Sequence, residues 1–227
     1  GGRLRHEGRA IDIVYKRLLV NELLEKRDEV GALIDAVRDR AVVIVNPFRC
    51  KPVHKKAIFE VLTDDDLQGL LTEAERAAIR AHVPWTRRVR EGRTRRYGEQ
   101  VDLPAHILAR REELVMKPND EYGGKGVFIG WEMSATEWTR GLEEALASSY
   151  VVQDKVDVLR QNFPRLVGEE GSDRGRLERG DFVVDLNPYV FGGEVVEGFL
   201  TRLSATSLAN VTSGAGQVPS FLVEPTA

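Results

Sequence analysis

The sequence predicts an α+β fold in which strands and helices alternate along the chain. Short apolar runs typical of strands are separated by segments whose apolar residues return at helical spacing. At 227 residues and 42% hydrophobic content, the chain is long enough to bury a core in one or two domains. A glycine-rich turn between two apolar runs, at 114–129, adds a hairpin to this alternation.

Composition and charge restrict the classes of partner. The formal net charge is -3 and basic and acidic residues are interspersed, so no nucleic-acid partner is expected. No apolar run approaches the roughly 20 residues of a membrane span, and we expect neither a membrane partner nor a signal peptide. Cys50 is the single cysteine, which excludes an intrachain disulfide and fits a reducing compartment. We therefore expect a cytoplasmic protein.

The first 62 residues are expected to form a strand-helix segment. A strand at 11–15 precedes a helix-like run near 19–38, in which apolar residues recur at roughly helical spacing. A second strand, at 41–45, is continuously apolar and is expected to be buried on both faces. A further helix opens at Lys55.

Residues 63–113 are expected to form a largely helical connector. Thr72 and Glu75 form a capping box at the start of a helix that runs to about His82. The arginine-rich segment 86–100 has little apolar periodicity, and we expect a mobile, solvated loop there.

The glycine-rich hairpin carries a lysine, two acids and a flexible loop between two strands. Lys117 would supply a positive charge for phosphate. Gly123 and Gly124 lack Cβ atoms, so their backbone N–H groups could approach phosphate oxygens closely. Asp120 or Glu121 could supply an oxygen ligand for Mg²⁺. The Walker A pattern is absent, and a plain glycine turn between strands explains the same residues.

Two helices are expected on either side of this hairpin, at 102–111 and at 134–147. The apolar strand at 150–156 follows and turns polar abruptly at Gln153. The edge of such a strand presents backbone N–H and C=O groups that can bind an adenine ring, although any strand end offers the same groups.

A second hairpin is expected around a Gly-Gly turn at 192–193. A two-residue turn would pair Asp185 with Leu200 and place Asn187 and Arg202 on the same face, with Arg202 diagonal to Asp185. Two interpretations stay open. One is a surface salt bridge across the hairpin, and the other is a cation facing a site where phosphate and carboxylate meet.

A third glycine turn, at 210–217, contains small hydroxyl residues. These residues could form another anion-binding nest, and they are equally typical of an ordinary turn.

Six segments follow one another in an order that is known from one protein family. They are Ile11–Arg17, Val45–Pro47 with Lys56–Ala57, Val115–Pro118 with Gly123–Gly124, Tyr150–Gln153, Asp185–Pro188 and Asn210–Gly214. This series resembles the circularly permuted ATP-grasp proteins, which include glutathionylspermidine synthetase-like proteins and, more distantly, glutathione synthetase. The resemblance runs from about residue 11 to the C-terminus.

The resemblance implies a circularly permuted ATP-grasp fold, in which ATP lies between two α+β lobes. Residues 1–62 would belong to the larger lobe with acceptor-side residues, and 63–113 would connect the lobes. Residues 114–156 would form the glycine-loop lobe with the adenine hinge, and 157–227 would complete the cleft. The implied activity is ligation of a small-molecule acid to an amine through an acyl phosphate, at the expense of ATP.

The resemblance also implies roles for individual residues. Lys56 and Lys117 would hold the ATP phosphates, and Glu121 would bind Mg²⁺. Gly123 and Gly124 would belong to the loop over the phosphates. The adenine hinge would be formed by Gln153, Asp154, Lys155 and Val156. The acceptor substrate or the transferred phosphate would face Arg17 and Arg202.

The chain departs from the family pattern in two places. Asn187 stands where many relatives carry an arginine, and the Glu-x-Asn metal motif of the family does not occur. We therefore expect the C-terminal part of a longer polypeptide, without its N-terminal half, that binds ATP weakly and does not turn over alone. A non-catalytic or regulatory nucleotide-binding module, and a protein in which every glycine loop is a plain turn, are the alternatives.

Overall fold

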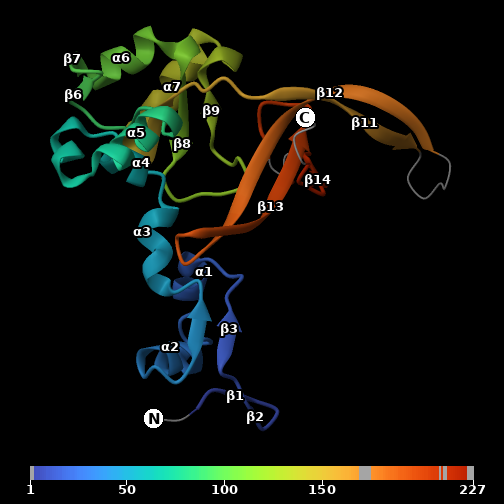
Figure 1. Cartoon of the computed structure of the whole chain (residues 1–227). Coiled ribbons are helices and arrows are strands. Elements are labelled where there is room, and N and C mark those ends of the chain that lie inside the picture. The colour runs from blue at the N-terminus through green and yellow to red at the C-terminus, as the bar shows by residue number, and fades with distance from the viewer. Residues whose placement is uncertain (1–2, 169–174, 210, 212–213, 224–227) are drawn as a thin grey trace. The chain divides into compact units, whose positions relative to one another are not determined.

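The computed structural model describes residues 3–168, 175–209, 211 and 214–223. The chain divides into two compact units, Gly1–Ile58 and Phe59–Ala227, and each is described by itself. Helices and several small sheets occur together, so the predicted α+β class is confirmed (Figure 1). Every helix among the described residues is too short or too polar to span a membrane.

The first unit is built around a parallel pair of strands. β3 (Ile13–Tyr15) pairs with β4 (Val43–Val45), with Val14 opposite Ile44. The other elements described in this unit are β1 (Arg5–His6), β2 (Arg9–Ala10), α1 (Val20–Glu25), α2 (Gly31–Arg38), a 3-10 turn at Phe48–Cys50 and α3 (Lys51–His54).

Two predictions for the first unit are wrong. β4 is not buried on both faces, because Ile44 is buried whereas its neighbour Val43 is 60% exposed. Successive residues of a strand face opposite sides, and here one side is covered. The helix expected at 19–38 is two helices separated by a turn. The residues between Leu24 and Val30 are all polar, so that turn has no apolar side chain to bury.

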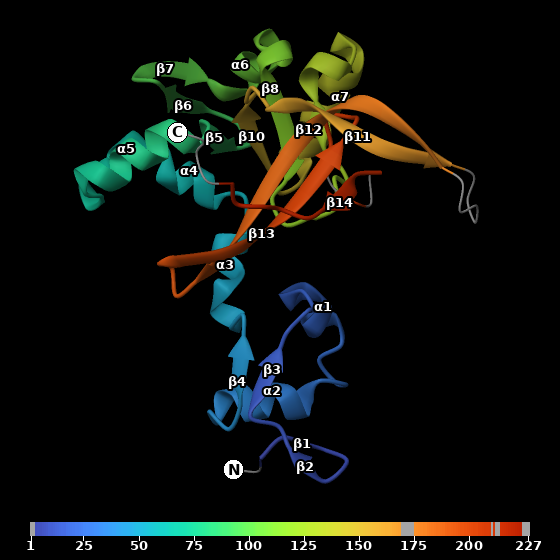
Figure 2. The same ribbon diagram turned by 45° about the vertical axis from the view of Figure 1, so that its right-hand side comes forward.

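The second unit contains a four-stranded antiparallel sheet with the strand order β5-β10-β8-β9. Its strands are β5 (Thr86–Arg88), β10 (Tyr150–Asp154), β8 (Leu114–Pro118) and β9 (Phe128–Ile129). One face of the sheet packs on α6 (Leu103–Ala109) and α7 (Ala135–Ala147), as Figure 2 shows. The core between them includes Leu103, Ile107, Met116, Trp138, Leu142 and Val152.

Helices of the second unit begin at the caps that the sequence indicates. Thr72 caps α5 (Glu73–His82) and Ser134 caps α7, each as part of a capping box with the glutamate three residues later. Asp102 caps α6 by accepting the N–H of Ala105. The shorter helices described here are α4 (Ile58–Leu62) and 3-10 turns at Asp65–Leu70, Arg111–Glu113 and Gly130–Glu132.

The arginine-rich segment 86–100 is ordered, so the prediction of a mobile loop is wrong. It contains β5 and much of the hairpin of β6 (Arg93–Arg96) and β7 (Glu99–Asp102). Arg87 is only 3% exposed, and its guanidinium carbon lies 5.2 Å from the ring centre of Trp85. Because a buried arginine takes the place of an apolar residue, the sequence shows no apolar periodicity here and the strand was not recognised.

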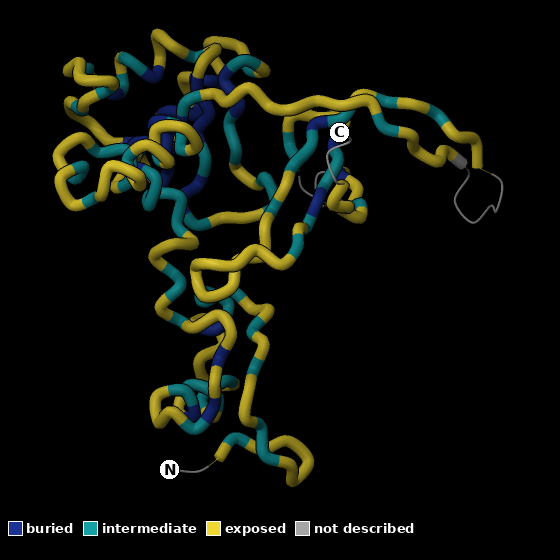
Figure 3. Tube along the Cα trace, viewed as in Figure 1, coloured by how far each residue is buried: buried dark blue, intermediate teal, exposed yellow. Residues whose placement is uncertain are grey.

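A second antiparallel sheet follows, with the strand order β11-β12-β13-β14. Its strands are β11 (Arg160–Gly168), β12 (Gly175–Phe191), β13 (Val195–Ser204) and β14 (Gly216–Val218). Figure 3 shows that much of β11 and of the β12–β13 hairpin is exposed, whereas buried residues gather in the four-stranded sheet and its helices. Residues 210, 212 and 213 of the third predicted glycine turn lie outside the described residues.

The β12–β13 hairpin exists, but its predicted register is wrong by two residues. Asp185 lies opposite Arg202, not opposite Leu200. One residue of the difference comes from the connection, since Phe191 pairs with Val195 and three residues lie between them. The other comes from a bulge, where β13 carries one extra residue beside the step from residue 189 to 190.

Gly130 lies against the backbone of the neighbouring turn, and we predict that Gly130→Ala lowers the free energy of unfolding by about 3 kcal/mol. A Cβ there would lie 1.9 Å from the carbonyl oxygen of Arg111 and 2.8 Å from that of Leu114. Gly69→Ala is the control, because nothing lies within 4 Å of its Cβ position. Urea denaturation measures both variants, and equal midpoints would contradict the close packing.

His106 predicts a pH dependence of stability. Burial, and then the positive charge of Arg96, lowers the pKa of His106, and Nε2 has no hydrogen-bond partner in the described part of the chain. Below about pH 6.5, His106 therefore binds a proton in the unfolded chain more readily than in the folded chain. The contribution of neutral His106 to the free energy of unfolding is thus fully present above that pH and is lost as the pH falls through the lower pKa of the folded state. Urea midpoints of His106→Gln should fall less than those of the native chain between pH 7 and pH 5.

Candidate functional site

The candidate site lies on the face of the four-stranded sheet opposite to α6 and α7. Directly opposed residues of antiparallel strands project to the same side. Two rows of residues cross β8, β10 and β5 on this face: Lys117, Val151 and Arg88 in one row, and Val115, Gln153 and Thr86 in the next. Lys117 and Arg88 are the members of these rows that are not buried. Residues that alternate with these, such as Met116 and Val152, belong to the core.

Lys117 is held in place by the side chain of Gln153. Its Nζ donates to Oε1 of Gln153 at 2.8 Å, and Nε2 of Gln153 donates to Oγ1 of Thr86 at 2.9 Å. Gln153 and Thr86 are buried, whereas Lys117 is half-buried. The two ends of the amide are therefore used within the sheet, and Gln153 positions the lysine.

Two backbone N–H groups of the predicted hinge already donate hydrogen bonds to carbonyl groups of the protein. The N–H of Asp154 donates to the carbonyl of Trp85 at 2.9 Å, and the N–H of Lys155 donates to that of Glu113 at 2.7 Å. Within the described chain, the first N–H of this segment without a partner belongs to Val156. A ligand at the hinge would therefore bind the N–H of Val156 and the carbonyl groups before it.

The side chains of the hinge also have partners. The carboxylate of Asp154 accepts hydrogen bonds from Arg96 at 3.1 Å and from Tyr97 at 2.7 Å. The Nζ of Lys155 lies 4.5 Å from the ring centre of Trp131, a cation–π contact. These contacts fix Asp154 on one side of the segment and Lys155 beside Trp131.

Glycines of the loop between β8 and β9 have left-handed backbone, which residues with a Cβ atom rarely adopt. β8 and β9 form the predicted hairpin, and Gly123 and Gly124 have φ values of 73° and 76°. Gly126 has a φ of 68°, and a Cβ there would lie 2.9 Å from Cγ of Pro118 and from Oη of Tyr150. Figures 1 and 2 both show this loop running beside the β12–β13 hairpin.

Burial changes the pKa of three side chains around the sheet. It raises the pKa of Tyr150 to about 12, with a smaller effect of the hydrogen bond to Glu144. Burial, followed by the hydrogen bond to Asp154, also raises the pKa of Tyr97, and burial lowers the pKa of Arg87. Both tyrosines are therefore neutral hydrogen-bond donors at physiological pH.

The loop carboxylates fit a metal that arrives with phosphate. Among the described residues, no group of three or more His, Cys, Asp or Glu side chains could hold a metal ion. Glu121 is exposed in the loop beside Asp120. Mg²⁺ commonly keeps several waters and binds one or two carboxylates together with substrate phosphates. Glu121 and its neighbour satisfy that requirement only when a phosphate is present.

A cavity of about 400 Å³ lies between the four-stranded sheet and the β11–β14 sheet. This volume is within the range of small-molecule sites. Lys117 lines the cavity, together with apolar residues of the first sheet, the hinge residues 154–157, and Val183 and Leu208 on the other side. The cavity therefore joins the predicted lysine and the predicted hinge to the C-terminal hairpin region.

Arg202 is neutralised by Asp185. Nε of Arg202 donates to Oδ2 of Asp185 at 2.6 Å, and Nδ2 of Asn187 donates to the same oxygen at 2.7 Å. Asp185 and Asn187 alternate along β12 with residues of the other face and share the side of Val183, which lines the cavity. The three predicted residues are thus brought together, with their charges balanced.

Arg17 and Lys56 belong to the first unit. Arg17 is exposed after β3, and Lys56 is half-buried between α3 and α4. Since the two units are described separately, the expected approach of these two cations to the ATP phosphates stays a prediction.

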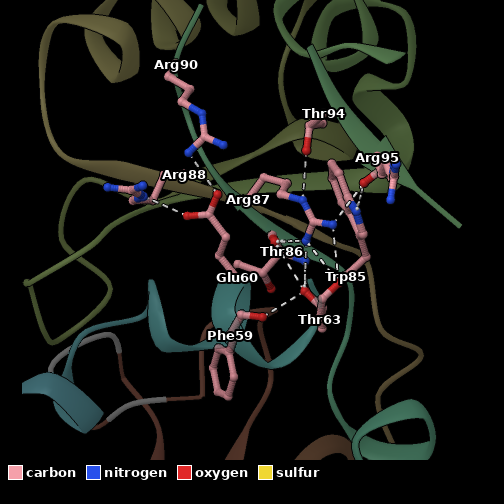
Figure 4. A network of polar contacts seen from close by, with 10 residues as sticks. All are labelled: Phe59, Glu60, Thr63, Trp85, Thr86, Arg87, Arg88, Arg90, Thr94 and Arg95. Atoms are coloured by element: carbon pink, nitrogen blue, oxygen red, sulfur yellow. Dashed lines mark hydrogen bonds and ion pairs between the residues drawn. The ribbon is translucent and has the colours of Figure 1, made fainter. Parts of the chain in front are cut away.

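A larger cavity of about 820 Å³ shares the hinge residues 154–157. Its most buried cation, Arg87, donates to carbonyl oxygens of Thr63, Thr86 and Arg95 and to the hydroxyl of Thr94 (Figure 4). A guanidinium satisfied by the protein in this way holds elements together. For this reason we place the candidate site in the smaller cavity, where Lys117 lies.

None of the protein-family models compared with the chain matches it, and no curated protein matches it either. Function has to be inferred from the residues described above.

Sequence reasoning missed Trp131, which lines the cavity, and it missed that Arg88 belongs to the sheet. Trp131 lies in the 3-10 turn that follows β9, so its place beside the hinge depends on the pairing of β9 with β8. Arg88 was hidden in the segment expected to be a loop. The alternation of Thr86 and Arg88 with Arg87 would have been informative once that segment was recognised as a strand.

Arg87 is expected to be a structural residue. We predict that Arg87→Met lowers the free energy of unfolding by about 3 kcal/mol, because buried carbonyl groups lose their donor. Arg95→Gln is the control, since its guanidinium pairs with exposed Asp66 and its loss should change stability by less than about 1 kcal/mol. Urea denaturation of both variants tests this, and similar small losses would show that the Arg87 network contributes little.

Proposed function

We propose that the chain binds ATP in the 400 Å³ cavity and belongs to an ATP-dependent carboxylate–amine ligase with an ATP-grasp fold. The cavity carries this proposal, because it is lined both by Lys117 and by the hinge residues 154–157. The family resemblance had paired a phosphate-binding lysine with an adenine hinge from sequence order alone. A common cavity for the two is what nucleotide binding requires.

The two ends of the cavity suit the two ends of a nucleotide. Val115, Ile129 and Val156 offer an apolar environment for an adenine ring beside the N–H of Val156, which has no hydrogen-bond partner among the described residues. Lys117 and the loop that carries Gly123 lie one step further along the strand, where the phosphates would extend. Backbone N–H groups of such a loop, together with an ammonium group, are typical phosphate ligands.

In the proposed reaction, the carboxylate of the acid substrate attacks the terminal phosphorus of ATP and ADP leaves. The amine then displaces phosphate from the resulting acyl phosphate, which gives the amide. Lys117 would neutralise phosphate oxygens in both steps, and the glycine loop would exclude water from the acyl phosphate. Mg²⁺ held with the phosphates by Glu121 would supply further neutralisation of charge.

A nucleotide-binding module without catalysis is the second candidate. It is favoured by the pairing of Arg202 with Asp185, which leaves no net charge for an acceptor carboxylate at that place. The amide of Asn187 adds no cation. In this case nucleotide binding would regulate contacts with another protein.

Binding of Mg-ATP to the 227-residue chain is the first test. We expect a measurable heat on titration, and at least a tenfold weaker affinity for Lys117→Ala, because a hydrogen bond to a charged group is lost. Lys125→Ala is the matched control, an exposed lysine in the same loop that does not line the cavity. Absence of any heat with the native chain would exclude the nucleotide site.

Turnover separates the ligase from the regulatory module. If the protein is a ligase, mixtures of acids and amines should stimulate release of phosphate from ATP. Lys117→Ala should lower that release at least about 100-fold, as expected for loss of an electrostatic contact to the transition state. Binding of ATP without stimulated phosphate release by any acid and amine pair would favour the module.

A further inference from the structure

Arg88 lies in the same row of the sheet as Lys117. Both pair with Val151 of β10, from opposite sides, so both project from the same face of the sheet. Lys117 lines the 400 Å³ cavity, and Arg88 lies outside that lining. Two strand spacings separate their Cα atoms by about 10 Å. Val151 between them is buried, so an anion that both long side chains reach would lie above Val151, at their charged ends.

A buried carboxylate orients Arg88. Glu60 of α4 is 8% exposed, and its Oε2 accepts a hydrogen bond from Nε of Arg88 at 2.7 Å. Its Oε1 accepts from Nη1 of Arg90 at 2.9 Å, so both oxygens of the carboxylate are used (Figure 4). The side chain of Arg88 is nevertheless 60% exposed. Glu60 thus fixes the Nε side of the Arg88 guanidinium, while the terminal nitrogens face solvent.

Arg88 shares its carboxylate partner with a second arginine. Both Arg88 and Arg90 pair with the single carboxylate of Glu60. Only Nε of Arg88 has a partner in the described part of the chain, so both terminal nitrogens of its planar group can donate to an anion. Such a pair of donors matches the spacing of phosphate oxygens.

Adjacent arginines of β5 therefore have opposite roles. Arg87 is buried and its donors are used by backbone carbonyls, whereas Arg88 projects to the other side of the strand and donates to Glu60 through Nε (Figure 4). Alternation along the strand is the cause.

We propose that Arg88, positioned by Glu60, binds the terminal phosphate of the nucleotide opposite Lys117. The inference rests on the proposed ATP site. With the adenine at the hinge, the row of Lys117 and Arg88 lies towards the phosphate end of the ligand. The phosphoryl group that is transferred to the acid would then lie between the two cations.

Titration calorimetry with Mg-ATP and Mg-ADP on the full chain tests this assignment. Arg88→Gln should weaken ATP binding at least tenfold and ADP binding by a smaller factor, because ADP lacks the terminal phosphate. Arg90 still pairs with the buried Glu60 in this variant, so its urea midpoint without ligand should fall only slightly. Arg140→Gln is the control. It removes the same charge from an exposed position of α7, on the other side of the sheet, and should leave both affinities unchanged.

Two further variants separate positioning from direct contact. Arg88→Lys keeps the charge without the paired donors, so its ATP affinity should lie between those of Arg88→Gln and the native chain. Glu60→Gln should weaken ATP binding in the native background and have little additional effect when combined with Arg88→Gln.

The outcomes distinguish this inference from the proposed function. Native ATP binding together with unchanged ATP affinity of Arg88→Gln overturns the role of Arg88 and leaves the site intact. Equal weakening of ATP and ADP, or a matching loss of unliganded stability, also overturns a contact with the terminal phosphate. Failure of the native chain to bind ATP removes the nucleotide site itself.

Discussion

The pairing of β8 with β10 is the constraint on which the candidate site depends. Its register sorts alternate residues of the two strands to opposite faces, so that Met116 and Val152 enter the core while Lys117 and Gln153 face the cavity. A slip by one residue would reverse every side chain of one strand. The apolar packing against α6 and α7 resists that slip, because it would bury a lysine in place of a methionine. The register of the β8–β10 pair thus determines both the core packing and the placement of the charged groups.

The candidate site combines residues that are held in place with a neighbouring glycine loop. Hydrogen bonds to Trp85 and Glu113 hold the hinge backbone, and the amide of Gln153 holds Lys117. The loop between β8 and β9 contains glycines with left-handed backbone, which can change conformation at little steric cost. A ligand bound there would meet preformed polar groups on one side and gain contacts on the other as the loop orders around it.

Helix caps and turns were predictable from the sequence, whereas strand register and the burial of polar residues were less predictable. The caps at Thr72 and Ser134 and the glycine hairpin depend on residues a few positions apart, and the structure has them where the sequence indicates. The register of Asp185 was missed because the connection has three residues and not two, and because a bulge adds one more residue without a clear sequence signal. Arg87 was missed because its burial depends on carbonyl groups of Thr63 and Arg95, which other elements supply. Lys117 and the strand edge of the hinge were candidates from the residues themselves, the resemblance assigned them to one nucleotide site, and both line the same cavity.

The open face of the β3–β4 pair has a consequence for dynamics. The first unit buries few apolar side chains among its described residues, namely Leu23, Ala36, Val42 and Ile44, whereas the core of the second unit is several times larger. Local opening requires less free energy where fewer contacts are lost, so the amide hydrogens of the first unit should exchange with solvent before those of the second. Arg17 and Lys56 lie on this less protected unit. A ligand that binds Arg17 and Lys56 must therefore also order the residues around them, which costs entropy. The affinity of such a ligand will depend on temperature and denaturant more steeply than the affinity of a ligand bound by the second unit alone.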